Sequence, residues 1–124
     1  MPDEITLTLP AEEDFRRVAH LVIGGLAVRL DLTWETLEDL QLALDGVLER
    51  RDEEGEVTVS VRVDAGELHT LVGPFSEDAL RELEHDDGGL GLRRILETTC
   101  DRIDLSDRGG ARWVELTKRV ARTA

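Results

Sequence analysis

Residues 87–96 read Asp87-Gly88-Gly89-Leu90-Gly91-Leu92-Arg93-Arg94-Ile95-Leu96, a glycine-rich segment followed by the start of an apolar helix. Such a segment brings backbone amides together at a helix N-terminus, where they favour an anion such as phosphate. Glycines also serve turns with positive φ angles that bind nothing. The segment therefore predicts a loop and a helix to about residue 98, with anion binding as one of two interpretations.

The segment after this helix predicts a β-hairpin. Residues 103–105 and 111–116 have the apolar and polar alternation of strands, and the segment Asp107-Arg108-Gly109-Gly110 between them is typical of a tight turn. The chain is therefore expected to end in two paired strands.

The first part of the chain predicts a strand and a helix. Residues 5–9 alternate between apolar and threonine side chains, and Pro10 ends this edge strand. The helix that follows has apolar residues at helical spacing, and its expected buried side consists of Phe15, Val18, Ala19, Val22 and Leu26. Gly24 and Gly25 inside this helix indicate either a close neighbour or a loosened helix.

A second helix is predicted after residue 33. Thr33 is its expected N-cap, and Leu32 and Leu37 occupy the positions of a hydrophobic staple. The expected buried side of this helix consists of Leu37, Leu40, Leu44, Val47 and Leu48.

A hairpin and a short helix are predicted in the middle of the chain. Residues 57–63 alternate valine with polar residues, residues 64–67 form a turn, and the second strand runs from Leu68 to Val72. Gly73-Pro74 is expected to end that strand, and Ser76 to cap a short helix that carries Leu80 and Leu83. The complete order predicts an α+β fold with a mostly antiparallel sheet and helices on one face.

Length and composition indicate one compact domain over residues 1–124, because 40% of the residues are hydrophobic. The net charge of −13 argues against a nucleic-acid partner. The sequence has no apolar run of membrane-spanning length and no basic start typical of a signal peptide. These features predict a cytoplasmic protein without a membrane partner, with its single cysteine, Cys100, packed in the core.

The order of elements, the glycine-rich segment and the final hairpin resemble the histidine-kinase-like ATPase domain in its short bacterial form, that of the anti-sigma-factor serine kinases. The resemblance covers nearly the whole chain. It implies a two-layer sandwich, a nucleotide site and binding to a sigma factor and its antagonist.

The resemblance also implies a catalytic pair on the second helix, which this chain lacks. The family has a glutamate as general base and, four residues later, an asparagine that binds Mg²⁺; the matching positions are Gly46 and Arg50. Glycine cannot accept a proton and a guanidinium cannot bind a metal cation. A one-residue shift would present Asp45 and Glu49 instead, an alternative that disturbs the buried leucine stripe.

The adenine acceptor is also missing, whereas the glycine-rich loop is present. The family's aspartate falls where this chain reads Val72-Gly73-Pro74-Phe75-Ser76, and Asp78 is a poor substitute. The residues that match the family's nucleotide loops are Gly89, Gly91, Leu92 and Gly110. No cofactor is therefore expected, and ATP with Mg²⁺ would bind only if the site is active after all.

Other chemistries find less support in the sequence. His85-Asp86-Asp87 are consecutive residues that rarely converge on a metal without a further ligand, and His20 and His69 belong to unrelated elements. No metal site is expected. No serine or cysteine nucleophile has an evident base.

Binding to another protein is the remaining function. The resemblance places a partner-docking arginine at Arg17, whose alternative role is an intrahelical pair with Glu13. Strand alternation places Trp113 on the outer face of the sheet, where it either lies on arginine stems such as those of Arg62 or Arg102 or forms an interface.

These observations together predict an anti-sigma-factor-like regulator that acts by partner switching, a pseudo-kinase with a degenerate ATP site. Its expected partners are a sigma factor, an anti-anti-sigma protein or both, and a homodimer is a further alternative. An active ATP-dependent serine/threonine kinase that phosphorylates an anti-anti-sigma factor is the second interpretation. A purely structural dimerisation module is the third.

Overall fold

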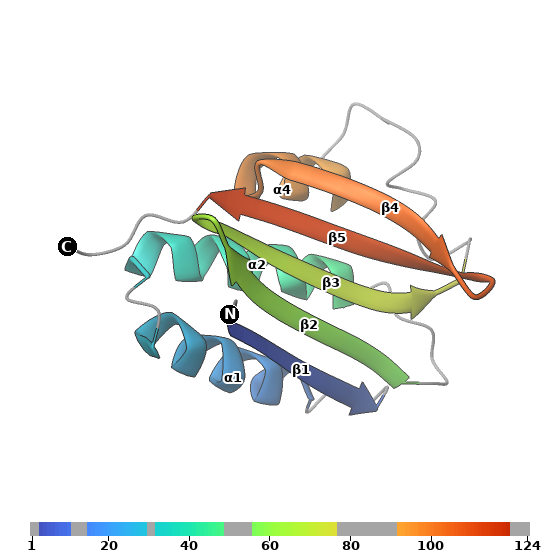
Figure 1. Cartoon of the computed structure of the whole chain (residues 1–124), viewed down its shortest axis with the longest axis horizontal. Coiled ribbons are helices and arrows are strands. Elements are labelled where there is room, and N and C mark those ends of the chain that lie inside the picture. Colours follow the sequence, from blue (N-terminus) through green and yellow to red (C-terminus); the bar gives the residue numbers. More distant parts are fainter. Residues whose placement is uncertain (1–2, 11–14, 30–31, 49–55, 77–91, 120–124) are drawn as a thin grey trace.

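The computed structural model of the protein describes residues 3–10, 15–29, 32–48, 56–76 and 92–119. Five antiparallel strands form one sheet in the order β1-β2-β3-β5-β4 (Figure 1). The strands are β1 (Asp3–Pro10), β2 (Glu56–Asp64), β3 (Glu67–Phe75), β4 (Arg102–Arg108) and β5 (Ala111–Arg119). The described helices are α1 (Phe15–Arg29), α2 (Trp34–Leu48) and α4 (Leu92–Thr99).

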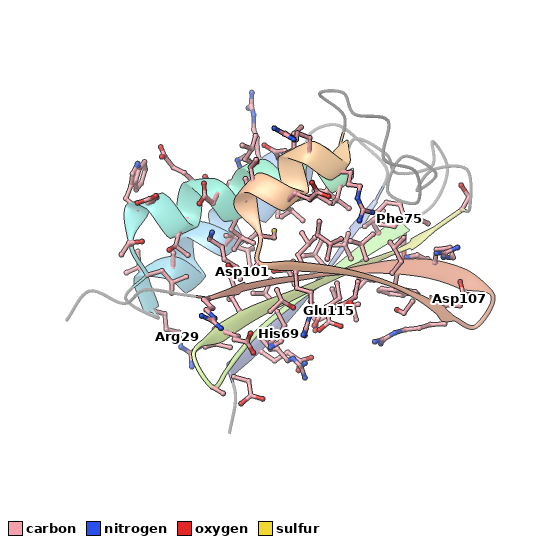
Figure 2. The ribbon with its side chains drawn as sticks, turned by 90° about the horizontal axis from the view of Figure 1, so that it is seen from above. Arg29, His69, Phe75, Asp101, Asp107 and Glu115 are labelled. Atoms are coloured by element: carbon pink, nitrogen blue, oxygen red, sulfur yellow. The ribbon has the colours of Figure 1, made fainter. Side chains whose placement is uncertain are left out.

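All three helices lie on the same side of the sheet, so the described part of the chain has two layers (Figures 1 and 2). The core lies between these layers and consists mainly of aliphatic side chains from α2 and the inner face of the sheet, with Ile23 of α1, Leu96 of α4 and Phe75 of β3. The valines of β2 at positions 57, 59, 61 and 63 are all buried, as their alternation predicts. The α+β two-layer prediction is therefore confirmed.

Helix α2 lies in the middle of the helical layer and begins as its sequence predicts. The backbone amide of Thr36 donates to Thr33 Oγ1 at 3.2 Å, which satisfies one of the free amides at the helix start. Leu32 and Leu37 both pack against the core, as the staple requires. Leu40, Leu44, Val47 and Leu48 are buried. The cap and the buried side of this helix are confirmed.

Helix α1 differs from its prediction in orientation. Among the α1 side chains that the structure describes, Ile23 and Ala27 are the buried apolar ones, whereas Val18, expected to be buried, is exposed and Val22 is partly buried. The reason is that apolar residues occupy nearly every side of α1 between residues 21 and 28, so sequence periodicity could not single out one side. The side chains of the other predicted residues, Phe15, Ala19 and Leu26, lie outside those described. The helix continues through Gly24 and Gly25, and a Cβ atom at either position would meet nothing within 4 Å.

Strand β3 extends past Gly73-Pro74, so the prediction that these residues end the strand is wrong. The peptide bond between them is cis. Pairing with β5 shifts register between Val72 and Phe75 and resumes where Phe75 lies opposite Arg112. Proline has no amide hydrogen to donate to a neighbouring strand, so the ladder is interrupted here without ending.

The final hairpin is confirmed and is longer than predicted. Gly109 and Gly110 form its turn with φ angles of 59° and 83°, a conformation that favours glycine.

Among the described helices, none has the length and apolar character needed to cross a membrane.

Candidate functional site

The two sides of α2 face different helices, which decides where the predicted catalytic positions lie. Asp39 Oδ2 accepts a hydrogen bond from Lys118 Nζ at 3.1 Å, and the same ammonium donates to the carbonyl oxygen of Thr99, the last residue of α4, at 2.8 Å. Gly46 follows Asp39 by two helical turns and lies on the same side of α2. Gly46, the position of the family's general base, is therefore buried on the side of α2 that faces α4.

Asp45 lies on the other side of α2. His20 Nε2 of α1 and Asp45 Oδ1 are 2.7 Å apart, and both side chains are partly buried. The carboxylate of Asp45 is therefore directed at α1, which does not favour the alternative in which Asp45 replaces the missing base. Glu49, its proposed partner, lies outside the described residues.

Most of the other residues that the resemblance assigns to the nucleotide site lie outside the described part of the chain. Arg50, Gly89, Gly91 and Asp78 lie outside the described residues, as does the segment His85-Asp86-Asp87. Leu92 is the first residue of α4. Gly110 lies in the other layer, at the β4–β5 turn, where its positive φ angle accounts for the glycine. Residues 72–75 form the end of β3, Ser76 follows it, and none of these residues contributes a carboxylate.

Arg17 is exposed on α1, as expected for a docking residue. Glu13, its alternative partner, lies outside the described residues. Two apolar side chains of the same helix face solvent, because Leu21 is 76% exposed and Val28 is 79% exposed. Exposed apolar side chains that gather on one helix are typical of a protein-interaction surface.

Trp113 lies on the outer face of the sheet, as its strand position predicts. Its indole ring covers Gly73, so that a Cβ atom added to Gly73 would come within 2.5 Å of Trp113 Cδ2. Arg62 and Arg102, the two arginines expected beneath the ring, are directed at other residues, namely Glu115 and Asp104. The ring is half-buried against the backbone of β3, so packing against Gly73 accounts for part of its burial.

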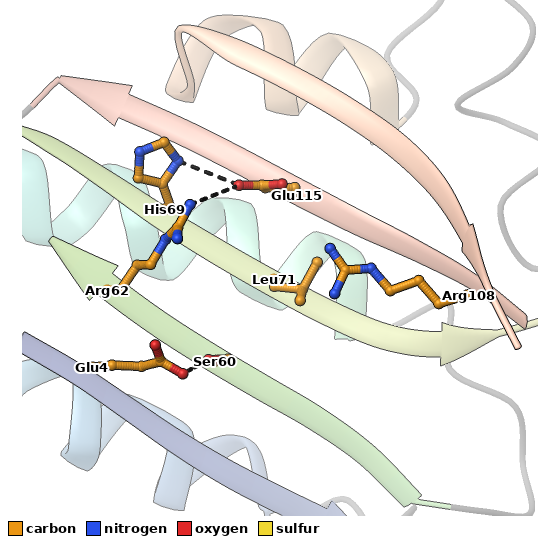
Figure 3. Close-up of a pocket in the computed structure, with 7 residues that line it drawn as sticks. All are labelled: Glu4, Ser60, Arg62, His69, Leu71, Arg108 and Glu115. Atoms are coloured by element: carbon orange, nitrogen blue, oxygen red, sulfur yellow. Dashed lines mark hydrogen bonds and ion pairs between the residues drawn. The ribbon is translucent and has the colours of Figure 1, made fainter. Parts of the chain in front are cut away.

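A pocket of about 230 Å³ lies on the same outer face (Figure 3). His69 Nδ1 and Glu115 Oε1 are 3.3 Å apart, Arg62 Nη2 lies 3.8 Å from the same oxygen, and Ser60 Oγ donates to Glu4 Oε1 at 3.3 Å. The pocket is lined by Glu4, Ser60, Arg62, His69, Leu71, Arg108 and Glu115. Its acidic groups therefore have partners within the pocket, on the face of the sheet opposite the helices.

Cys100 packs against the core, as predicted. Burial raises the pKa of its thiol above the ordinary value, an effect partly offset by its hydrogen bond with Thr99 and by the positive charge of Lys118. A raised pKa disfavours the reactive thiolate. In the described part of the chain, no three histidine, cysteine or carboxylate side chains gather as a metal site would require.

Sequence reasoning missed the features that connect the helices. Neither the contact between His20 and Asp45 nor the bridge from Lys118 to Asp39 has a local sequence signal, because each joins residues far apart in the chain. The exposure of Leu21 and Val28 could have been suspected, since α1 contains more apolar residues than one buried side can hold.

Comparison with known proteins identifies the relatives. No protein-family model matches the chain. The serine-protein kinase RsbW of Listeria monocytogenes serovar 1/2a is 31% identical over 85% of this chain and 80% of its own length. The proteins of the same name from Halalkalibacterium halodurans and Bacillus subtilis are 27% and 24% identical over 88% and 94% of this chain, and over 79% and 85% of their own lengths.

A solved structure has the same fold. The crystal structure of the RsbU and RsbW domains of a Mycobacterium tuberculosis protein matches with a TM-score of 0.71 at 18% identity. The match covers 98% of this chain and 34% of the solved one, so this chain spans about a third of that protein's crystallised length. From the sequence identity and coverage of these relatives, the chain belongs to the family of the serine-protein kinase RsbW.

Proposed function

We propose that the protein is a cytoplasmic anti-sigma-factor-like regulator that binds a sigma factor, an anti-anti-sigma protein or both, and that it acts by partner switching without nucleotide chemistry. The observation that carries this proposal is the surface of α1, where Arg17 and the apolar residues Leu21 and Val28 are exposed. The family resemblance assigns partner docking to this helix. A guanidinium beside apolar groups can pair with a partner carboxylate while the apolar groups exclude water.

The proposed loss of nucleotide chemistry rests on α2. Gly46 takes the place of the general base on the side of α2 that faces α4, and Arg50 takes the place of the Mg²⁺ ligand. Neither side chain can perform the family's role. We expect no MgATP binding at millimolar concentration, and a saturable isotherm in calorimetry would contradict this part of the proposal.

The second candidate is an active ATP-dependent serine/threonine kinase. It is favoured by the names of the relatives, which are serine-protein kinases. An assay of the unchanged protein for ATP hydrolysis separates the two candidates. Gly46→Glu alone should not give hydrolysis while Arg50 still occupies the metal-ligand position, and hydrolysis by this variant would contradict the assignment of these two positions. Hydrolysis or phosphate transfer to a serine substrate by the unchanged protein would establish the kinase.

The docking role of Arg17 is tested by titrating the sigma factor from the same genome into the unchanged protein, Arg17→Ala and Arg94→Ala. Arg94 is an exposed arginine on α4 and serves as the matched control. We expect Arg17→Ala to weaken binding by about tenfold or more, with an unfolding free energy within about 0.5 kcal/mol of the unchanged protein. A large loss of stability with unchanged affinity would make Arg17 structural instead.

A further inference from the structure

The pocket on the outer face of the sheet has no part in the proposed function. All five strands contribute side chains to it, because the antiparallel register brings their outer-facing positions together. Leu71 lies between Arg62 and Arg108 in the close-up view (Figure 3). This site, defined by the seven lining residues named above, is called the outer-face pocket below. It is therefore assembled by the fold and not by one segment of the sequence.

The two carboxylates of the outer-face pocket already have partners inside it. Glu4 Oε1 accepts a hydrogen bond from Ser60 Oγ at 3.3 Å. Glu115 Oε1 lies 3.3 Å from Nδ1 of His69, whose side chain is only 13% exposed. These neighbours take up part of the acceptor capacity of both carboxylates. A cationic ligand would therefore have to compete with groups that are already in place.

The guanidinium groups of the pocket are less well paired than its carboxylates. Arg62 Nη2 lies 3.8 Å from Glu115 Oε1, which is longer than a hydrogen bond. The side chain of Arg108 has no hydrogen bond or ion pair with any residue in the described part of the chain, and it extends over the sheet toward Leu71 (Figure 3). A guanidinium has five N–H donors in a planar fork. The outer-face pocket therefore offers unused donors, which favour an anion.

The size and the floor of the pocket limit which anion fits. Its volume of about 230 Å³ is below the roughly 300–1,000 Å³ of pockets that hold drug-sized ligands, so a molecule of a few carbon atoms fits best. An arginine pairs with a carboxylate through two parallel hydrogen bonds. Leu71 beside that arginine offers an apolar contact that inorganic phosphate would leave uncovered. This combination favours a carboxylate attached to a short carbon chain.

We propose that the outer-face pocket binds a small organic acid, whose carboxylate pairs with the guanidinium of Arg108 and whose carbon chain covers Leu71. The pocket lies on the face of the sheet opposite α1, so it is separate from the docking surface of the proposed function. One carboxylate suits the pocket better than two, because its two glutamates balance its two arginines. The ligand is a monocarboxylate, and its two sources are simple acids and amino acids.

The test titrates four small molecules into the full chain labelled with nitrogen-15 and follows the backbone amide signals by NMR. They are butyrate, its neutral analogue butanamide, 2-aminobutyrate and inorganic phosphate. We expect butyrate to cause saturable shifts at the amides of Leu71 and Glu115, and to bind at least about tenfold more tightly than butanamide. Tighter binding of 2-aminobutyrate than of butyrate would identify an amino acid as the source of the carboxylate, and weaker binding a simple acid.

Two variants on β4 show whether this binding uses Arg108. Arg108→Gln removes the charge and should weaken butyrate binding by about tenfold or more. Arg102→Gln is the matched control and should leave the affinity unchanged, because Arg102 is on the same strand and face but pairs with Asp104 and does not line the pocket. Both arginines are exposed, so both variants should keep the far-UV circular dichroism spectrum of the unchanged protein.

Four results would overturn the proposal. Butyrate shifts no amide of the pocket, butanamide binds as tightly as butyrate, phosphate binds more tightly than either, or Arg108→Gln binds butyrate as well as the unchanged protein does. A second copy of this chain is the other occupant to test. If the free protein sediments as a dimer that Arg108→Glu dissociates, the outer-face pocket belongs to an interface, and the small organic acid is ruled out.

Discussion

The contact between Gly73 and Trp113 allows a sharp test of the sheet packing. A Cβ atom added to Gly73 would lie 2.5 Å from Cδ2, 2.7 Å from Cε3 and 2.9 Å from Cγ of the indole. These are ring atoms close to the tryptophan backbone, so the whole ring has to move. Overpacking of this kind costs about 1–3 kcal/mol. We therefore expect Gly73→Ala to lower the unfolding free energy by about that amount.

Gly73→Ala should no longer lower the unfolding free energy once the indole is removed. Gly73 does not have a positive φ angle, so alanine is compatible with its backbone. An alanine also restricts the unfolded chain, which stabilises the fold by about 0.4–1 kcal/mol. In the Trp113→Ala background, Gly73→Ala should therefore be neutral or stabilising.

The double-mutant cycle compares the unchanged protein, Gly73→Ala, Trp113→Ala and the double variant. Urea denaturation monitored by far-UV circular dichroism measures the unfolding free energy of each. Circular dichroism is preferred to fluorescence because one of the two tryptophans is deleted in the cycle. The coupling energy should exceed about 1 kcal/mol. If Gly73→Ala changes stability equally in both backgrounds, the indole does not lie against Gly73.

Three other predictions concern stability. Thr70 is fully buried, and its Oγ1 has no hydrogen-bond partner in the described structure. Thr70→Val should therefore raise the unfolding free energy by about 1 kcal/mol in urea denaturation. A lower unfolding free energy would show that the hydroxyl does have a hydrogen-bond partner. Lys118→Met should cost about 1–3 kcal/mol, because it leaves Asp39 and the Thr99 carbonyl without their donor; an unchanged midpoint would show that the bridge does not form. Burial raises the pKa of the Cys100 thiol, so the unfolded state loses that proton first, and the stability advantage over Cys100→Ala should shrink as pH rises above about 8.5. A constant difference between pH 7 and pH 10 would contradict that assignment.

The sequence predicted best those elements in which one periodicity dominates. Strand β2 alternates valine with polar residues without a break, and α2 has a cap and a single leucine stripe, so the buried sides of both were predicted correctly. Helix α1 was assigned correctly as a helix, but Val18 was wrongly predicted to be buried, because apolar residues surround the helix. Its exposed side depends on which of them the sheet can accept, and this is a tertiary property.

The candidate site was only partly accessible from the sequence, for a related reason. Gly46 could be assigned from the resemblance alone, and the structure adds that this glycine is buried on the side of α2 that faces α4. The contact of Asp45 with His20 makes the alternative carboxylate less favourable, and no local pattern indicates a contact between residues 25 positions apart. Likewise, Gly73 was interpreted as a strand breaker, whereas it lies beneath a tryptophan from β5.

The claim that most needs a direct test is that the protein binds its partner without nucleotide. Isothermal titration of the sigma factor from the same genome into the purified protein, once in nucleotide-free buffer and once with millimolar MgATP, measures this directly. We predict a saturable isotherm with the same dissociation constant in both buffers, because the family's metal ligand and adenine acceptor are missing at Arg50 and Gly73, in addition to the base at Gly46. Binding that occurs only with MgATP, or that tightens tenfold or more in its presence, would contradict the account.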